Sequence, residues 1–137
     1  MGALALAGCA TYFILVLRRC DDVRDVRRGS FDYRLCGVGG ELVARMPIVA
    51  PASEPLFSWT LAEGTKPGRN LLKYESVAPP SRVRTTLAEY LRGTGFSEKS
   101  PDSDYEWWTD RQTELGLSIR GAGGGSHVEI LHNTGSD

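Results

Sequence analysis

Two residue types that build metal sites and cross-links are scarce in this chain of 137 residues, which has three cysteines and two histidines. No CxxC pair occurs, and both histidines lie far downstream of the last cysteine, so the chain lacks the patterns of a zinc site and of a disulfide scaffold. Cys20 and Cys36 can form a bridge only if the domain faces an oxidising compartment, and the alternative is two unrelated thiols. The sequence leaves this choice open.

An excess of charge of one sign is missing as well. Sixteen Lys and Arg residues oppose seventeen Asp and Glu residues, which gives a net charge of −1. Nucleic-acid binding requires a clustered excess of basic side chains, so we expect no nucleic-acid partner. The length suits one domain and is too short for two independent cores.

The longest uncharged run stands at the N-terminal end. Residues Gly2 to Leu17 contain no charge and no proline, and Arg18-Arg19 end the run. Sixteen helical residues span about 24 Å, a little less than the roughly 30 Å of a hydrocarbon core. The run has no polar face, which argues against a buried core helix. We therefore expect residues 1–19 to be a transmembrane anchor or a signal segment, with the membrane as a partner.

A second pattern lies inside the same run. Leu6-Ala7-Gly8-Cys9 matches the cleavage site of bacterial lipoproteins, which makes Cys9 a candidate lipidation site. Against this, no basic residue precedes Cys9, whereas a signal peptide has a charged start and a longer apolar stretch. Orientation is open for a related reason. The arginines after the run place the domain in the cytoplasm if Met1 is the true start, and an upstream start places it outside the cytoplasm.

The remaining chain divides into two parts by pattern. Residues 20–55 are expected to be a juxtamembrane segment and a first hairpin, built from Phe31 to Leu35 and Glu41 to Met46. Residues 56–137 are expected to form a soluble strand-helix-meander domain. Its predicted strands are residues 57–61, 70–77, 105–109, 115–119 and 128–131, and a loop covers residues 121–126.

The clearest helix signal follows Pro79-Pro80. Apolar residues recur at i, i+4, i+7 and i+8, namely Val83, Leu87, Tyr90 and Leu91, and glycines at 93 and 95 end the helix. The predicted fold class is α+β: an N-terminal transmembrane helix followed by a small antiparallel sheet that a helix covers on one face.

The stretch from Tyr74 to Thr134 combines a VRTTLAEYLRGTGF helix with a tryptophan-containing meander and a final VEIL strand. In these features it resembles small domains of unknown function in anchored proteins, either transmembrane or lipoprotein, of GC-rich bacteria. The shared motifs are structural, and the resemblance implies no catalytic residue, cofactor or metal ligand.

Two motifs that resemble ligand sites each miss a required residue. The glycine-rich run 121–126 lacks the following helix and the lysine of a phosphate-binding loop, and His127 stands where the lysine is expected. The carboxylates Asp102, Asp104 and Glu106 alternate like the start of a calcium loop, but Trp107 occupies the position that requires glycine. We therefore expect a hairpin turn and a solvated strand face, without a metal or cofactor.

The two histidines do not indicate catalysis either. His127 and His132 are five residues apart, so a strand projects them to opposite faces, and neither has a serine or cysteine partner at a diagnostic spacing. We expect both to be ordinary surface residues.

The adjacent tryptophans are the one local feature that indicates binding. On a strand, one of Trp107 and Trp108 points to the core and the other to solvent. If Tyr105 and Trp107 share the exposed face, they form an aromatic platform for a sugar ring or a protein. The alternative buries Trp107 and leaves Trp108 partly covered at an edge.

The sequence therefore favours a non-enzymatic, membrane-anchored accessory or interaction protein at the cell membrane, with a protein or cell-envelope glycan as partner through Tyr105, Trp107 and Trp108. The alternatives are a small envelope-associated hydrolase or ligand-processing enzyme, and a small subunit of a membrane complex.

Overall fold

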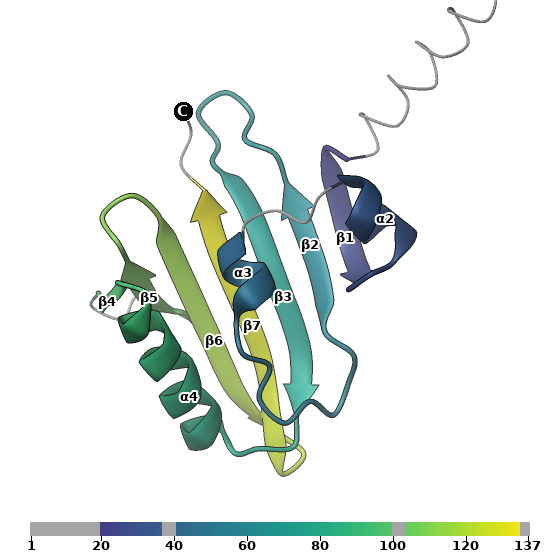
Figure 1. Cartoon of the computed structure of the whole chain (residues 1–137). Coiled ribbons are helices and arrows are strands. Elements are labelled where there is room, and N and C mark those ends of the chain that lie inside the picture. Colours follow the sequence, from purple (N-terminus) through teal and green to yellow (C-terminus); the bar gives the residue numbers. More distant parts are fainter. Residues whose placement is uncertain (1–19, 37–40, 100–103, 135–137) are drawn as a thin grey trace, which may run out of the picture.

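One antiparallel sheet dominates the computed structural model, which describes residues 20–36, 41–99 and 104–134. Its seven strands lie in the order β1-β2-β3-β7-β6-β5-β4 (Figure 1). The strands are β1 (Asp22–Arg27), β2 (Leu56–Thr60), β3 (Gly68–Ser76), β4 (Ser97–Glu98), β5 (Glu106–Thr109), β6 (Glu114–Ala122) and β7 (Gly125–Thr134). In the described residues three helices accompany them: α2 (Phe31–Cys36), α3 (Glu41–Arg45) and α4 (Pro80–Gly93).

The last strand lies in the middle of the sheet. β7 pairs with β3 from Gly68↔Thr134 to Ser76↔Ser126, and with β6 along its other edge. The turn between β6 and β7 has two residues, Gly123 and Gly124, both with positive φ. Such a two-residue turn matches the twist of an antiparallel pair and favours glycine. The predicted hairpin at residues 121–126 is therefore confirmed, with a tighter turn than expected.

The core forms where helix α4 packs on the central strands. Along β3 and β7, alternate side chains such as Leu72, Tyr74, Val128 and Ile130 are buried. The predicted helical stripe is confirmed, since Val83, Leu87 and Leu91 are fully buried, although Tyr90 is only half-buried and Ala88 takes part instead.

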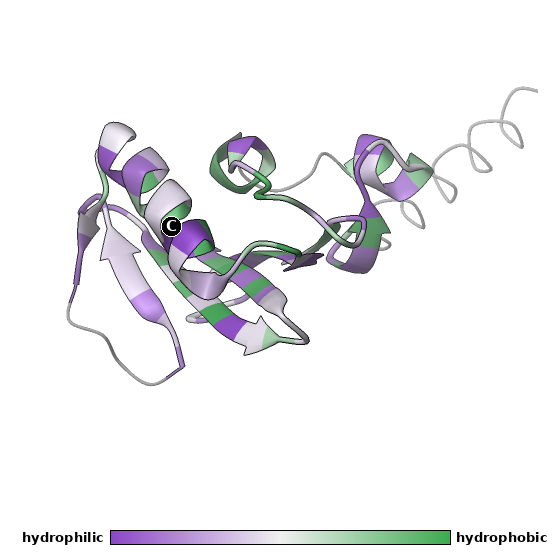
Figure 2. Cartoon of the chain, turned by 90° about the horizontal axis from the view of Figure 1, so that it is seen from below, coloured by the Kyte–Doolittle hydropathy of each residue, from purple (hydrophilic) through white to green (hydrophobic). Residues whose placement is uncertain are grey.

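Helix α3 and the residues that follow it cover the same face of the sheet as α4. Val43 of α3 and the following residues Met46 and Val49 join the core beside α4. The Tyr74 hydroxyl accepts a hydrogen bond from the Val49 backbone N–H at 3.1 Å, which ties this segment to β3. Figure 2 shows that α2, α3 and α4 all lie on one side of the sheet.

The predicted fold class is wrong. The described chain is mainly a seven-stranded antiparallel sheet with three short helices, and no described helix is long and apolar enough to cross a membrane. The anchor predicted at residues 1–19 lies outside the described residues, and so does Cys9.

The predicted first hairpin is also wrong, because residues 31–36 and 41–45 form the helices α2 and α3. Short apolar runs satisfy strand and helix periods almost equally. Phe31 and Leu35 are four residues apart, a spacing that fits one face of a helix and also one face of a strand. The helix is favoured at its start, where the Ser30 hydroxyl accepts a hydrogen bond from the Tyr33 N–H at 3.3 Å, a helix N-cap contact.

Strand β1 was missed for a different reason. Val23 and Val26 are three residues apart in a charged segment, which hides the strand period. A register shift between them, with Asp25 at a φ of 53°, brings Val23 opposite Trp59 and Val26 opposite Phe57. This irregularity, a β-bulge, lets both valines face the core and also protects the sheet edge.

Candidate functional site

The face of the sheet opposite the helices, called the open face here, is not covered by any helix of the described chain (Figure 2). Because strand residues alternate between faces, its composition follows from the pairing register. It combines apolar, aromatic and charged side chains: Leu56, Ser58, Thr60, Arg69, Leu71, Lys73, Glu75, Tyr105, Trp107, Arg120, His127, Glu129 and Leu131.

A shallow hollow of about 480 Å³ lies on the open face between β1 and Tyr105. The paired residues Leu71 and Leu131 line it, and Ser58 and Thr60 of β2 also border it. The volume lies within the usual range for small-ligand sites. Because apolar and polar side chains both line the hollow, it favours a ligand that has both kinds of surface.

The charges of the hollow are mostly paired. Lys73 Nζ lies 2.5 Å from Asp25 Oδ1, and an Arg24 nitrogen lies 3.1 Å from an Asp22 carboxylate oxygen. Arg69 makes no ion pair within the described residues and remains available to a ligand. The hollow thus presents donors, acceptors and one unpaired guanidinium.

Tyr105 and Trp107 form an aromatic platform beside the hollow. Their ring centroids are 5.6 Å apart at an interplanar angle of 37°. A Cβ atom on Gly116 would stand 2.9 Å from the Tyr105 ring and 3.2 Å from the Trp107 ring, so both rings approach the backbone at this glycine. This cross-strand glycine lets both rings pack close to the sheet, and both side chains remain partly exposed.

Trp108 points to the opposite face. It is 1% exposed, and the Arg92 guanidinium lies 5.3 Å from its ring centroid. Of the three predicted contact residues, the structure therefore brings Tyr105 and Trp107 together on the open face and places Trp108 in the core, out of reach of a partner. The alternative in which Trp107 is the buried indole is wrong.

A chain of polar contacts fixes Tyr105. Its hydroxyl donates to Glu129 Oε2 at 3.0 Å, Glu129 Oε1 lies 3.1 Å from His127 Nε2, and His127 Nδ1 lies 2.5 Å from Glu75 Oε1. The contact with Glu75, followed by that with Glu129, raises the pKa of His127 above 6.5. Burial raises the pKa of Tyr105, and its bond to Glu129 adds to this effect.

Glu129 remains ionised in this chain of contacts. Burial favours its protonated form, but hydrogen bonds from His127 and Tyr105 outweigh burial and lower its pKa. With both ring nitrogens facing carboxylates, a protonated His127 donates at each end and has no free lone pair to accept a proton. The arrangement is suited to holding Tyr105 in place.

The second histidine lies on the other face, as its spacing predicted. His132 pairs with Leu115 on the covered side and is 7% exposed, so the expectation that both histidines are surface residues is wrong for His132. Burial lowers its pKa. Of the three alternating carboxylates that were expected on a solvated strand face, Glu106 bonds Arg84 of α4, Asp104 is exposed, and Asp102 lies outside the described residues.

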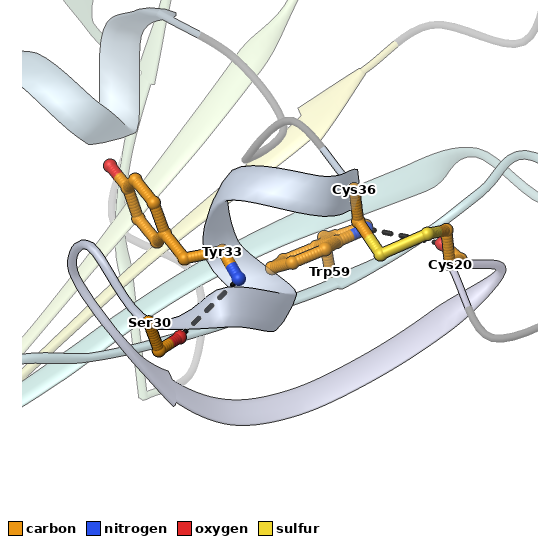
Figure 3. The surroundings of a disulfide bond; sticks show 5 residues. All are labelled: Cys20, Ser30, Tyr33, Cys36 and Trp59. Carbon is orange, nitrogen blue, oxygen red and sulfur yellow. Dashed lines mark hydrogen bonds between the residues drawn. A yellow bond between two sulfur atoms is a disulfide. The ribbon is translucent and has the colours of Figure 1, made fainter. Parts of the chain in front are cut away.

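A disulfide joins Cys20, just before β1, to Cys36 at the end of α2, with 5.2 Å between their Cα atoms (Figure 3). The Trp59 indole N–H donates to the Cys20 carbonyl at 3.2 Å. Tyr33 of α2 packs edge-on against Phe57, at 5.4 Å between ring centroids. The bridge therefore closes α2 over the β1–β2 side of the sheet and settles the choice that the sequence left open.

Comparison with known proteins adds no relative: no protein-family profile, curated protein or solved structure matches this chain.

The pKa values of the two histidines should be shifted in opposite directions from 6.5. In an NMR pH titration we expect the midpoint of His127 above 6.5 and that of His132 below it. Because folding raises the pKa of His127, its stabilising contribution is fully present below about 6.5 and is lost as the pH rises through its folded value. For His132, the unfolded chain binds the proton first, so stability falls as the pH drops below about 6.5.

Glu75→Gln is the matched variant for this titration. It should lower the midpoint of His127 and leave that of His132 unchanged, because only His127 contacts Glu75. Equal midpoints for the two histidines in the unmodified chain would contradict the assigned contacts.

Proposed function

We propose that this chain is a non-catalytic binding domain of the cell envelope that holds a glycan on its open face. The observation that carries the proposal is the aromatic platform of Tyr105 and Trp107, seated at Gly116 beside the hollow. An aromatic ring with one free side suits the apolar face of a sugar. The paired charges of the hollow supply donors and acceptors for hydroxyl groups, and Arg69 suits a carboxylate on the same glycan.

The polar groups near the platform support binding more than catalysis. His127 is held between Glu75 and Glu129, and the Ser118 hydroxyl is buried without a hydrogen-bond partner among the described residues. A general base must reach the proton that it abstracts, and a nucleophile must reach its substrate. His127 does not fit the first condition and Ser118 does not fit the second, which argues against a hydrolase at this face.

The disulfide supports a location outside the cytoplasm. Disulfides form and persist in oxidising compartments and are rare in reducing ones. An extracytoplasmic domain agrees with the orientation expected for an upstream start. Membrane attachment is part of the proposal: either the apolar run 2–17 or a lipid on Cys9 supplies it, which keeps the domain at the envelope.

The redox state of two cysteines tests the location. When cells are lysed in the presence of a thiol-alkylating reagent, we expect Cys20 and Cys36 to remain unmodified until a reductant is added, as measured by peptide mass spectrometry. A Cys36→Ser variant is the control, since its Cys20 should react at once. Alkylation of both cysteines in the unreduced chain would contradict an extracytoplasmic domain.

Binding to purified peptidoglycan sacculi tests the glycan site. In co-sedimentation, Trp107→Ala and Tyr105→Ala should each weaken binding about tenfold, because a stacking contact is worth roughly 1 kcal/mol or somewhat more. Gly116→Ala should weaken binding too, since the added methyl displaces both rings. Val77→Ala, an exposed apolar residue away from the platform, should have no effect.

Sedimentation that is equal for all of these variants would contradict the open-face site. Absence of binding by the unmodified chain, together with a specific cross-link from position 107 to one envelope protein, would replace the glycan by a protein partner at the same face.

A further inference from the structure

Most of the large exposed apolar side chains of the described residues belong to the part of the chain around β1 and β2. Among the described residues, four large apolar side chains are exposed: Phe31 (69%), Leu35 (40%), Leu61 (60%) and Val77 (67%). Phe31 and Leu35 stand four residues apart on α2 and so lie on the same side of that helix. Three of the four exposed residues thus belong to α2 and to the loop after β2.

Leu35 and Leu61 lie where the chain leaves for the N-terminal apolar run, and Phe31 lies about one helical turn from Leu35, next to the end of β1. The disulfide ties Cys36, at the end of α2, to Cys20. The backbone N–H of Leu61 donates to the Asp21 carbonyl at 3.1 Å. Figure 1 shows α2 beside β1 at one edge of the sheet, with the start of β1 near the top of the view and the end of β3 near the bottom. Val77, which follows β3, is therefore remote from this surface.

The distance along the chain connects this surface to the apolar run. The run ends at Leu17, three residues before Cys20. Three extended residues reach at most about 11 Å. A bilayer that holds the run therefore lies within that distance of the Cys20–Cys36 bridge, and α2 cannot move away because the bridge fixes its last residue.

We propose that Phe31, Leu35 and Leu61 form a membrane-contact surface, which enters the interfacial layer of the bilayer beside the N-terminal run. Transfer of apolar side chains from water to the acyl boundary of a bilayer lowers the free energy. Arg34, between Phe31 and Leu35, is exposed and makes no ion pair within the described residues, which suits anionic headgroups. The inference rests on attachment through the apolar run, the first of the two modes of membrane attachment in the proposed function.

This contact sets the direction of the glycan site. The start of β1 and the loop after β2 are at the membrane end, so the strands rise away from the bilayer. The open face is then roughly perpendicular to the plane of the bilayer. A platform in this position meets material of the surrounding envelope and stays clear of the lipid surface.

Quenching by brominated lipid tests the contact. The full chain is bound to vesicles of phosphatidylcholine and phosphatidylglycerol, with and without bromine on the acyl chains. Phe31→Trp and Leu61→Trp each add an indole to the surface, and Val77→Trp is the matched control at the remote end. We expect the added emission at positions 31 and 61 to be quenched at least about twofold, because interfacial side chains reach the acyl boundary. That at position 77 should not be quenched.

Flotation of the same samples separates the two proposals. If the unmodified chain does not float with vesicles, membrane attachment itself fails, and the contact surface fails with it. If the chain floats but positions 31 and 61 are quenched no more than position 77, attachment stands and the contact surface is overturned. Greater quenching at 31 and 61 in floating chains supports the proposal.

Discussion

Burial of only one face of the sheet is the constraint on which the rest of the structure depends. The apolar side chains of β3 and β7 find their partners in α4 and in the segment of residues 41–50, all on one side. Hydrophobic burial is the main stabilising term in folding, so this side fixes the register. Once Leu72 and Ile130 point inward, Leu71 and Leu131 must point outward, and the hollow follows from the same alternation.

The open face keeps its ligand groups in place through backbone geometry and a chain of polar contacts. Gly116 lets Tyr105 and Trp107 approach the backbone, and Glu129 holds the Tyr105 hydroxyl. Both contacts reduce the conformational entropy that is lost on binding, because the rings are already positioned before a ligand arrives. The disulfide has the corresponding role at the other side of the sheet, where it fixes α2 next to β1.

The sequence predicts those parts of the fold whose pattern is local. The helical stripe and the strands of the C-terminal meander follow from their periods, and the alternation at Tyr105 and Trp107 allowed the platform as one of two alternatives. The polar contacts were out of reach, since Glu75 and His127 are joined only by the pairing of β3 with β7. Strand β1 was hidden by a bulge. The short helices at 31–36 and 41–45 were predicted as strands because their apolar runs are too brief to show a period.

Hydroxyl-radical footprinting of the neighbouring tryptophans tests the one-sided sheet most directly. Trp107 and Trp108 are adjacent residues of the same type, but the structure places the first on the open face and the second in the core. We predict that mass spectrometry finds oxidation of Trp107 in the folded chain and none of Trp108 until the chain is unfolded. Because a slip of one residue exchanges the two faces of a strand, oxidation of Trp108 in preference to Trp107, or of both equally, would contradict the account.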